Sequence, residues 1–158
     1  MKLRTGQKAP EINLPDQKGN IIKLSDLKGR WALIYFYPKD DTPGCTKEAC
    51  GLRDKMPDFK KIDFTVLGIS VDSPSSHKKF ADKYNLSFPL LADEDKKVVK
   101  SYGVWGKKKF MGKEYMGTNR QSFLVGPDGR IVKIYEKVNP EEHAEEILKD
   151  IKERIQWE

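Results

Sequence analysis

The chain has 158 residues, a length that fits one domain. Apolar residues make up 37% of it and charged residues 34%, and no apolar run approaches the ~18 residues that a membrane-spanning helix needs. The net charge is +6, and the 7 Phe, 6 Tyr and 3 Trp argue against a disordered chain.

The first half of the chain alternates between strand-like and helix-like segments. Residues 18–20 separate two short apolar runs and predict a hairpin. The apolar and aromatic run over residues 31–37 predicts a central strand that is buried on both faces. A polar loop follows it, then a helix over residues 45–55 and a second buried strand over residues 64–70.

The second half continues this alternation and then changes it. Ser73 and Asn139 are each followed by proline, which is typical of a helix start. In chain order the pattern predicts a helix to about residue 84, a strand over 88–92, a helix over 95–102, a hairpin of strands 121–125 and 131–135, and a last helix over 139–155.

This order places parallel strands with crossover helices first and an antiparallel pair last. It predicts an α/β fold with one mixed sheet covered by helices, and the thioredoxin-like fold has this order. No linker rich in proline, glycine or serine divides the chain, so we expect residues 1–158 to form a single domain. The first eight residues hold no apolar segment, so we expect no secretory signal, a cytoplasmic protein and no membrane partner.

The most informative segment is the polar loop after the first buried strand, because it places Cys45 where a strand ends and a helix begins. Free backbone N–H groups and the positive end of the helix dipole favour an anion there, and the thiolate is the reactive form of cysteine. Thr42 offers a hydroxyl to a ligand at the sulfur, and Gly44 lets a substrate approach the backbone closely. The alternative is a small, inert, buried cysteine, for which a polar loop is a poor setting.

Pro38, Thr42 and Cys45 form the pattern Pro-x-x-x-Thr-x-x-Cys. This pattern resembles the active-site signature of the peroxiredoxins. Residues 38–54 as a whole are similar to the Q-type branch, also called bacterioferritin comigratory proteins. Other segments resemble the same branch in the same order, and the resemblance covers about residues 6–153; these segments are residues 67–70, 91–95, 102–106 and 120–124.

The resemblance implies a thioredoxin-like fold and a thiol-dependent peroxidase. Cys45 matches the peroxidatic cysteine, whose thiolate attacks the O–O bond of hydrogen peroxide or an organic hydroperoxide and becomes a sulfenic acid. Thr42 matches the threonine that hydrogen-bonds the peroxide, and Pro38 matches the proline that shields the sulfur from water. Arg120 matches the arginine that holds thiolate and peroxide, where oriented donors would stabilise the transition state.

Cys50 lies five positions after Cys45. On an intact helix this spacing separates the two Cα atoms by about 8–9 Å, more than the ~7 Å limit of an unstrained disulfide. In Q-type peroxiredoxins with this spacing the matching cysteine is the resolving one, which implies that Cys50 attacks the sulfenic acid within the same chain. The first helical turns must then unwind, and Gly51 lowers that cost. The alternative is an inert Cys50 and an external resolving thiol.

The same resemblance implies a thioredoxin or a glutaredoxin-like donor as the reductant, and a monomer, because the resolving thiol belongs to the same chain. No metal, haem or flavin is expected. The two cysteines and the distant His77 and His143 lack a metal-ligand spacing, and no glycine pattern for a nucleotide is present. We expect both histidines at the surface, because charged residues surround them in the sequence.

Two other functions fit parts of the sequence. Residues 107–116 combine lysines with aromatic residues, a composition that suits single-stranded nucleic acid. A solvated loop or hairpin near the active site is the simpler interpretation, so we expect no nucleic-acid partner. A redox-regulated sensor or holdase could use the same Cys45. The resemblance favours the peroxidase.

Overall fold

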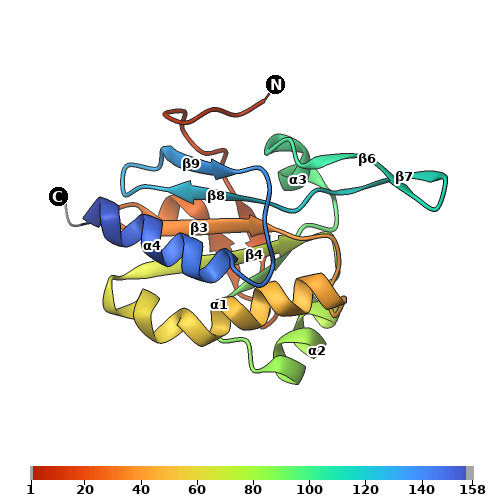
Figure 1. The fold of residues 1–158 in the computed structure, drawn as a ribbon, viewed down its shortest axis with the longest axis horizontal. Coiled ribbons are helices and arrows are strands. Elements are labelled where there is room, and N and C mark those ends of the chain that lie inside the picture. The colour runs from red at the N-terminus through yellow and green to blue at the C-terminus, as the bar shows by residue number, and fades with distance from the viewer. Residues whose placement is uncertain (1, 156–158) are drawn as a thin grey trace.

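The structure, a computed structural model, describes residues 2–155. At its centre lies a five-stranded sheet in the order β5-β4-β3-β8-β9 (Figure 1). Its parallel part and its antiparallel part meet at the central strand. The parallel part is β3 (Trp31–Phe36), β4 (Phe64–Ser70) and β5 (Leu90–Ala92), and the antiparallel part adds β8 (Gln121–Val125) and β9 (Ile131–Tyr135).

The remaining elements surround this sheet. The helices are α1 (Pro43–Lys61), α2 (Pro74–Tyr84), α3 (Lys97–Ser101) and α4 (His143–Ile155), with a short 3-10 helix η1 (Leu24–Leu27). Two further hairpins form sheets of their own, β1 (Asn13–Pro15) with β2 (Ile21–Lys23) and β6 (Trp105–Phe110) with β7 (Lys113–Thr118). Within residues 2–155 no helix has both the length and the hydropathy to span a bilayer.

The predicted α/β fold with a mixed sheet flanked by helices is confirmed, and two helix ends differ from the prediction. Helix α1 continues to Lys61 instead of ending near residue 55, because Met56 and Phe59 are buried in the core and the intervening Pro57 is exposed. Helix α4 begins at His143 instead of residue 139. The carbonyl of Asn139 accepts the backbone N–H groups of residues 142 and 143 in a turn that precedes the helix.

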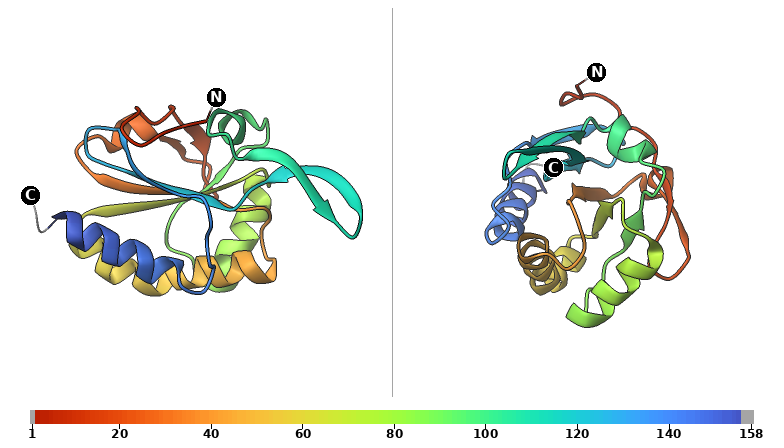
Figure 2. Two further views of the ribbon diagram at one scale, coloured as in Figure 1. Left: turned by 45° about the horizontal axis from the view of Figure 1, so that its top comes forward. Right: turned by 90° about the vertical axis from the view of Figure 1, so that its right-hand side faces the viewer.

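The core has two parts, one on each face of the sheet. Alternate residues of β3 point to opposite faces, as a strand requires. Leu33 and Tyr35 join the cluster that includes side chains of α1, α2 and α4. Ile34 and Phe36 join the cluster that includes side chains of α3 and the N-terminal segment. Figure 2 shows α1 and α4 side by side on one side of the sheet, with the N-terminal segment and α3 on the other.

The sheet register brings distant parts of the chain together at one edge. Strand β3 ends at Phe36 and leads through a loop into α1. Strand β8 runs antiparallel to β3, and Gln121 pairs with Phe36. Residues just before β8 therefore lie beside the end of β3, which puts Arg120 next to the start of α1.

Candidate active site

Cys45 lies in the first turn of α1. Thr42 is the N-cap residue, and its carbonyl accepts the first helical hydrogen bond from the Thr46 N–H at 2.8 Å. Because Pro43 carries no N–H, the backbone N–H groups of Gly44 and Cys45 are the donors that this helix end presents. The Cys45 side chain is only 1% exposed. A ligand at the sulfur must therefore be small, or the loop must move.

Arg120 binds the sulfur directly. Its Nη2 lies 3.2 Å from Cys45 Sγ, and its Nη1 donates to Glu48 Oε1 at 2.7 Å. Gly44 makes this approach possible, since a β-carbon at this position would lie 3.0 Å from Nη2. Burial lowers the pKa of the Arg120 guanidinium, but Cys45 and Glu48 raise it by more. The pKa therefore lies above its ordinary value. The predicted Cys45 and Arg120 thus meet across 75 residues of sequence.

Glu48 is a site residue that the sequence analysis missed. It is 1% exposed, and burial raises the pKa of its carboxyl to about 7 although Arg120 pulls it down. Within residues 2–155 neither Glu48 Oε2 nor the buried Tyr35 hydroxyl has a hydrogen-bond partner. Burial raises the pKa of Tyr35, and negative charge on Glu48 and Cys45 adds to the effect. The spacing of three residues from Cys45 to Glu48, one helical turn, is the signal that could have found Glu48.

Thr42 and Pro38 lie in the segment that leads into α1, and both are half-buried. The Thr42 hydroxyl donates to the carbonyl of Lys39 at 2.9 Å. Its proton is engaged in this bond, so its oxygen lone pairs are what it presents to a ligand.

Cys50 lies further along the same helix and is partly buried, and both cysteines are free thiols. Helix α1 is continuous from Pro43 to Lys61, so Cys45 and Cys50 are held apart by regular helix in this state. The next residue, Gly51, faces α4, since a β-carbon there would lie 3.8 Å from Ala144 Cβ.

Comparison with known proteins agrees with this geometry. A model of the AhpC/TSA family matches residues 5–134. Peroxiredoxin Bcp of Bacillus subtilis is 45% identical over 153 residues, which is 97% of this chain and 98% of that protein. Peroxiredoxin Bcp of Escherichia coli K12 is 48% identical over 151 residues, or 96% of this chain and 97% of that protein.

The chain belongs to the Q-type peroxiredoxins of the AhpC/TSA family. Peroxiredoxins are peroxidase enzymes that act on peroxides with a thiol reductant. A Xanthomonas campestris bacterioferritin comigratory protein, whose structures were reported for its alkyl peroxide reduction, superposes with a TM-score of 0.85 at 36% identity and covers 90% of this chain and 91% of its own. A cysteine mutant of Xylella fastidiosa PrxQ superposes with a TM-score of 0.89 at 33% identity, covering 98% and 99%.

In this peroxiredoxin the prediction that His77 lies at the surface is wrong. His77 is fully buried, and its Nδ1 lies 2.7 Å from Asp40 Oδ2 while its Nε2 lies 2.9 Å from the carbonyl of Leu91. A carbonyl only accepts, so Nε2 is the nitrogen that donates to Leu91. Tyr37 also donates to Asp40, at 2.7 Å. This network fastens the loop before Cys45 to α2 and β5.

The prediction that His143 lies at the surface is also wrong. It is 1% exposed, with Nε2 at 2.8 Å from Ser122 Oγ and Nδ1 at 3.0 Å from Glu146 Oε1. Burial lowers its pKa, although Glu146 acts in the opposite direction. Neither histidine could be placed from local sequence, because the residues that bury them come from distant strands.

Asp40, Asp72 and His77 could hold a metal ion by position alone, since each offers a ligand atom within 4.8 Å of the others. The same atoms already serve hydrogen bonds. The Asp72 carboxylate accepts from the Asp40 backbone N–H at 2.9 Å and from the Ser70 hydroxyl at 2.7 Å. The cluster therefore works as a clamp on the loop.

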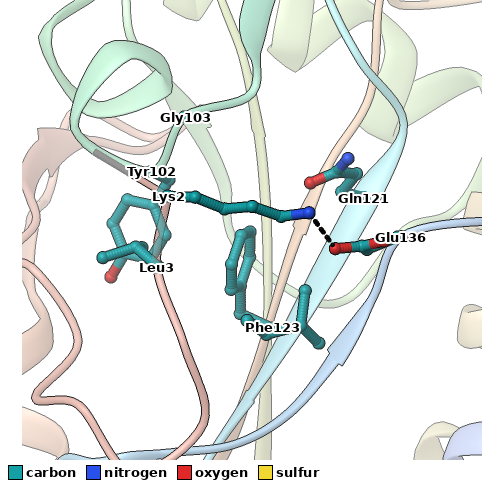
Figure 3. Close-up of a pocket in the computed structure, with 8 residues that line it drawn as sticks. Lys2, Leu3, Tyr102, Gly103, Gln121, Phe123 and Glu136 are labelled. Carbon is teal, nitrogen blue, oxygen red and sulfur yellow. Dashed lines mark ion pairs between the residues drawn. The ribbon is translucent and has the colours of Figure 1, made fainter.

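A pocket of about 340 Å³ lies away from Cys45 (Figure 3). Phe123 lines it from the sheet face opposite α1, and an ion pair of 2.8 Å joins Lys2 and Glu136 at its rim. None of the six site residues predicted from sequence lines this pocket. A peroxide is small and does not need a cavity of this size.

Proposed function

We propose that Cys45 is the peroxidatic cysteine and that this enzyme reduces hydrogen peroxide and small organic hydroperoxides. The observation that carries the proposal is the Arg120 guanidinium 3.2 Å from Cys45 Sγ at the N-terminal end of α1. Guanidinium and helix dipole both favour the thiolate. The alkyl peroxide reduction reported for the Xanthomonas campestris relative supports the substrate class.

In the first step the Cys45 thiolate attacks one oxygen of the peroxide. The S–O bond forms as the O–O bond breaks, Cys45 becomes a sulfenic acid, and the other oxygen takes up a proton and leaves as water or an alcohol. Negative charge gathers on the oxygens in the transition state. Arg120 and the N–H groups of α1 stabilise that charge.

Three further residues shape the peroxide site in this proposal. The oxygen of Thr42 accepts a hydrogen bond from the peroxide hydroxyl, since the Thr42 proton is used at Lys39. Half-buried Pro38 shields the sulfur from water. Gly44 leaves room for Arg120 and the substrate at the same helix end.

Cys50 resolves the sulfenic acid in the second step. Its thiol condenses with the Cys45 sulfenic acid, a disulfide forms and water leaves. The intact α1 keeps the two residues too far apart for this reaction, so the first turns of the helix unwind before the bond forms. A free and partly buried Cys50 is consistent with this order of events.

A thioredoxin or a glutaredoxin-like dithiol then reduces the Cys45–Cys50 disulfide. We propose a monomer, because peroxidatic and resolving thiols belong to one chain. We propose the cytoplasm as the compartment, because two free cysteines suit a reducing environment. No metal, haem or flavin takes part in these steps.

The test is peroxide consumption by the Cys45→Ser variant with dithiothreitol as reductant, with Cys50→Ser as the matched control. Cys45→Ser should lose turnover entirely, whereas Cys50→Ser should keep the first oxidation. Turnover retained in Cys45→Ser would overturn the proposal. Ready oxidation of Cys45 without recycling by any dithiol donor would favour the sensor or holdase instead.

A further inference from the structure

The β6–β7 hairpin projects from the body of the molecule at the end where α1 begins (Figure 1, Figure 2). It carries most of the large apolar side chains that are exposed among residues 2–154. These are Phe110, Met111, Tyr115 and Met116, which are 67%, 88%, 48% and 49% exposed. Aromatic and methionine side chains are enriched at protein interfaces, and an exposed apolar patch of several such residues can mark an interaction surface.

The two faces of the hairpin differ in composition. Cross-strand partners share a face, and the register pairs Lys108 with Tyr115 and Phe110 with Lys113. These four residues form one face, which we call the aromatic-basic face. The other face pairs Lys107 with Met116 and Lys109 with Glu114. Within residues 105–118 the single acidic side chain thus lies away from the aromatic-basic face.

Gly117 confirms which side chains share the aromatic-basic face. A β-carbon on Gly117 would lie 3.0 Å from Lys108 Cδ and 3.3 Å from Tyr115 Cε2. Both side chains therefore lie over the glycine. The Tyr115 ring and the Lys108 side chain therefore cover Gly117 at the base of this face.

The aromatic-basic face continues into the active site. Lys108 Nζ donates to the carbonyl of Thr118 at 2.9 Å, two residues before Arg120. Burial lowers the pKa of Lys108, the charge on Arg120 lowers it further, and Cys45 acts in the opposite direction. Lys108 therefore lies at the end of the aromatic-basic face that is nearer to Arg120.

We propose that the aromatic-basic face is the docking surface for the protein dithiol that reduces the Cys45–Cys50 disulfide. The proposal rests on the proposed function. The partner it fits has an apolar patch beside its dithiol and acidic residues around that patch. Phe110 and Tyr115 serve as aromatic anchors, and Lys113 meets the acidic rim. Docking here puts the partner's thiolate next to the opened start of α1.

The partner's dithiol supplies all the electrons and protons that reduction of the Cys45–Cys50 disulfide needs. One thiolate of the partner attacks a sulfur of the disulfide and forms a mixed disulfide between the two proteins. The partner's second thiol then attacks the partner's own sulfur in this mixed disulfide, and the enzyme's cysteine leaves as a thiol. The partner becomes a disulfide. Two electrons and two protons pass to Cys45 and Cys50.

The experiment compares two double variants that differ in the face they alter. The test variant is Lys113→Glu with Tyr115→Ser, on the aromatic-basic face. The control is Lys107→Glu with Met116→Ser, which makes the same change of charge on the opposite face, and its apolar residue is exposed to the same extent (49% against 48%). Turnover is measured with a bacterial thioredoxin, kept reduced by its reductase and NADPH, and separately with dithiothreitol.

The test variant should raise the KM for thioredoxin about tenfold, which corresponds to the loss of ~1.4 kcal/mol of binding. The control should change it by less than about twofold, and turnover with dithiothreitol should match the wild type in both, which also shows that both are folded. Higher salt should raise the wild-type KM for thioredoxin, because opposite charges are screened.

Equal KM values for the test and control variants would overturn the proposal. Loss of single-stranded oligonucleotide binding at low salt in the test variant, with an unchanged KM for thioredoxin, would overturn it in favour of a nucleic-acid surface. The two proposals fail separately. If the wild type turns over with dithiothreitol but not with thioredoxin, only the docking proposal is overturned. If it turns over with neither reductant, the proposed peroxidase function is overturned.

Discussion

At the scale of single residues, the main feature of the candidate site is that Arg120 hydrogen-bonds two groups, Cys45 and Glu48. Its two terminal nitrogens lie 3.2 Å from Cys45 Sγ and 2.7 Å from Glu48 Oε1. If both groups were ionised, one half-buried guanidinium would leave an excess of negative charge. The rise in the pKa of Glu48 relieves that excess, because a protonated Glu48 leaves the positive charge of Arg120 to Cys45.

Glu48 should make the stability of the fold fall as pH rises. Its ordinary pKa is 4.5 and burial raises it to about 7, so between these values the folded state holds a proton that the unfolded state releases. Ionising the buried Glu48 therefore lowers the free energy of unfolding. This loss is absent below pH 4.5, grows as pH rises and is complete above pH 7, where it is on the order of 3 kcal/mol.

Glu48→Gln keeps an oxygen for Arg120 and removes the titration. The free energy of unfolding of this variant, relative to the wild type, should therefore increase between pH 4.5 and 7. Urea unfolding followed at several pH values measures it. A difference that stays constant with pH would show that Glu48 ionises in the folded state as it does in the unfolded chain.

Helix α1 has to satisfy two opposite requirements at the scale of elements. In the proposed mechanism its intact first turn presents N–H groups to Cys45, and its unwound first turns let Cys50 reach that residue. The helix therefore needs a weak point that does not disturb the peroxide step. Gly51, next to Cys50, is such a point, since glycine costs a helix interior about 1 kcal/mol relative to alanine.

Gly51→Ala should slow disulfide formation without slowing the oxidation of Cys45. The new methyl group has room, since it would lie 3.8 Å from Ala144 Cβ, an ordinary contact. A gain of up to ~1 kcal/mol in the intact helix reduces the unwound population up to about fivefold. Timed acid quenching and alkylation of free thiols after a peroxide pulse measures both steps. An unchanged rate of disulfide formation would mean that the helix does not unwind at Gly51.

The β3–β4 pair also depends on one glycine. A β-carbon on Gly68 would lie 2.8 Å from the Tyr35 ring, which is buried between the strands and α1. Gly68→Ala should therefore displace Tyr35 and destabilise the fold by ~1–3 kcal/mol. Urea unfolding measures the loss, and wild-type stability in Gly68→Ala would show that the ring moves at no cost.

At the scale of the whole molecule, the fold and the candidate peroxidatic cysteine were predictable for the same reason. The apolar run of β3 and the loop that holds Thr42 and Cys45 are local patterns, and local patterns can be read in sequence. The motif also led to Arg120. Contacts between distant segments could not be predicted from the sequence. Glu48 as partner of Arg120 depends on the β3–β8 register, and no local pattern shows that register.

The two histidines illustrate the same limit. His77 and His143 lie among charged residues in sequence, yet each is buried by groups from a different strand. The elements that pack on a helix decide which of its residues are buried, and local composition does not show which elements those are. The β6–β7 hairpin was foreseen as basic and aromatic, but its separation into two unlike faces needs the cross-strand register.

The central claim is that Cys45 reacts with peroxide and that Cys50, on the same helix, closes the cycle after that helix opens. The most direct measurement is mass spectrometry of wild type and Cys50→Ser after one equivalent of hydrogen peroxide, with free thiols alkylated. We expect a Cys45–Cys50 disulfide in the wild type and a Cys45 sulfenic acid in the variant. An oxidised Cys45 beside an unmodified Cys50 thiol in the wild type would contradict the intrachain mechanism, and an unreacted Cys45 would contradict the account as a whole.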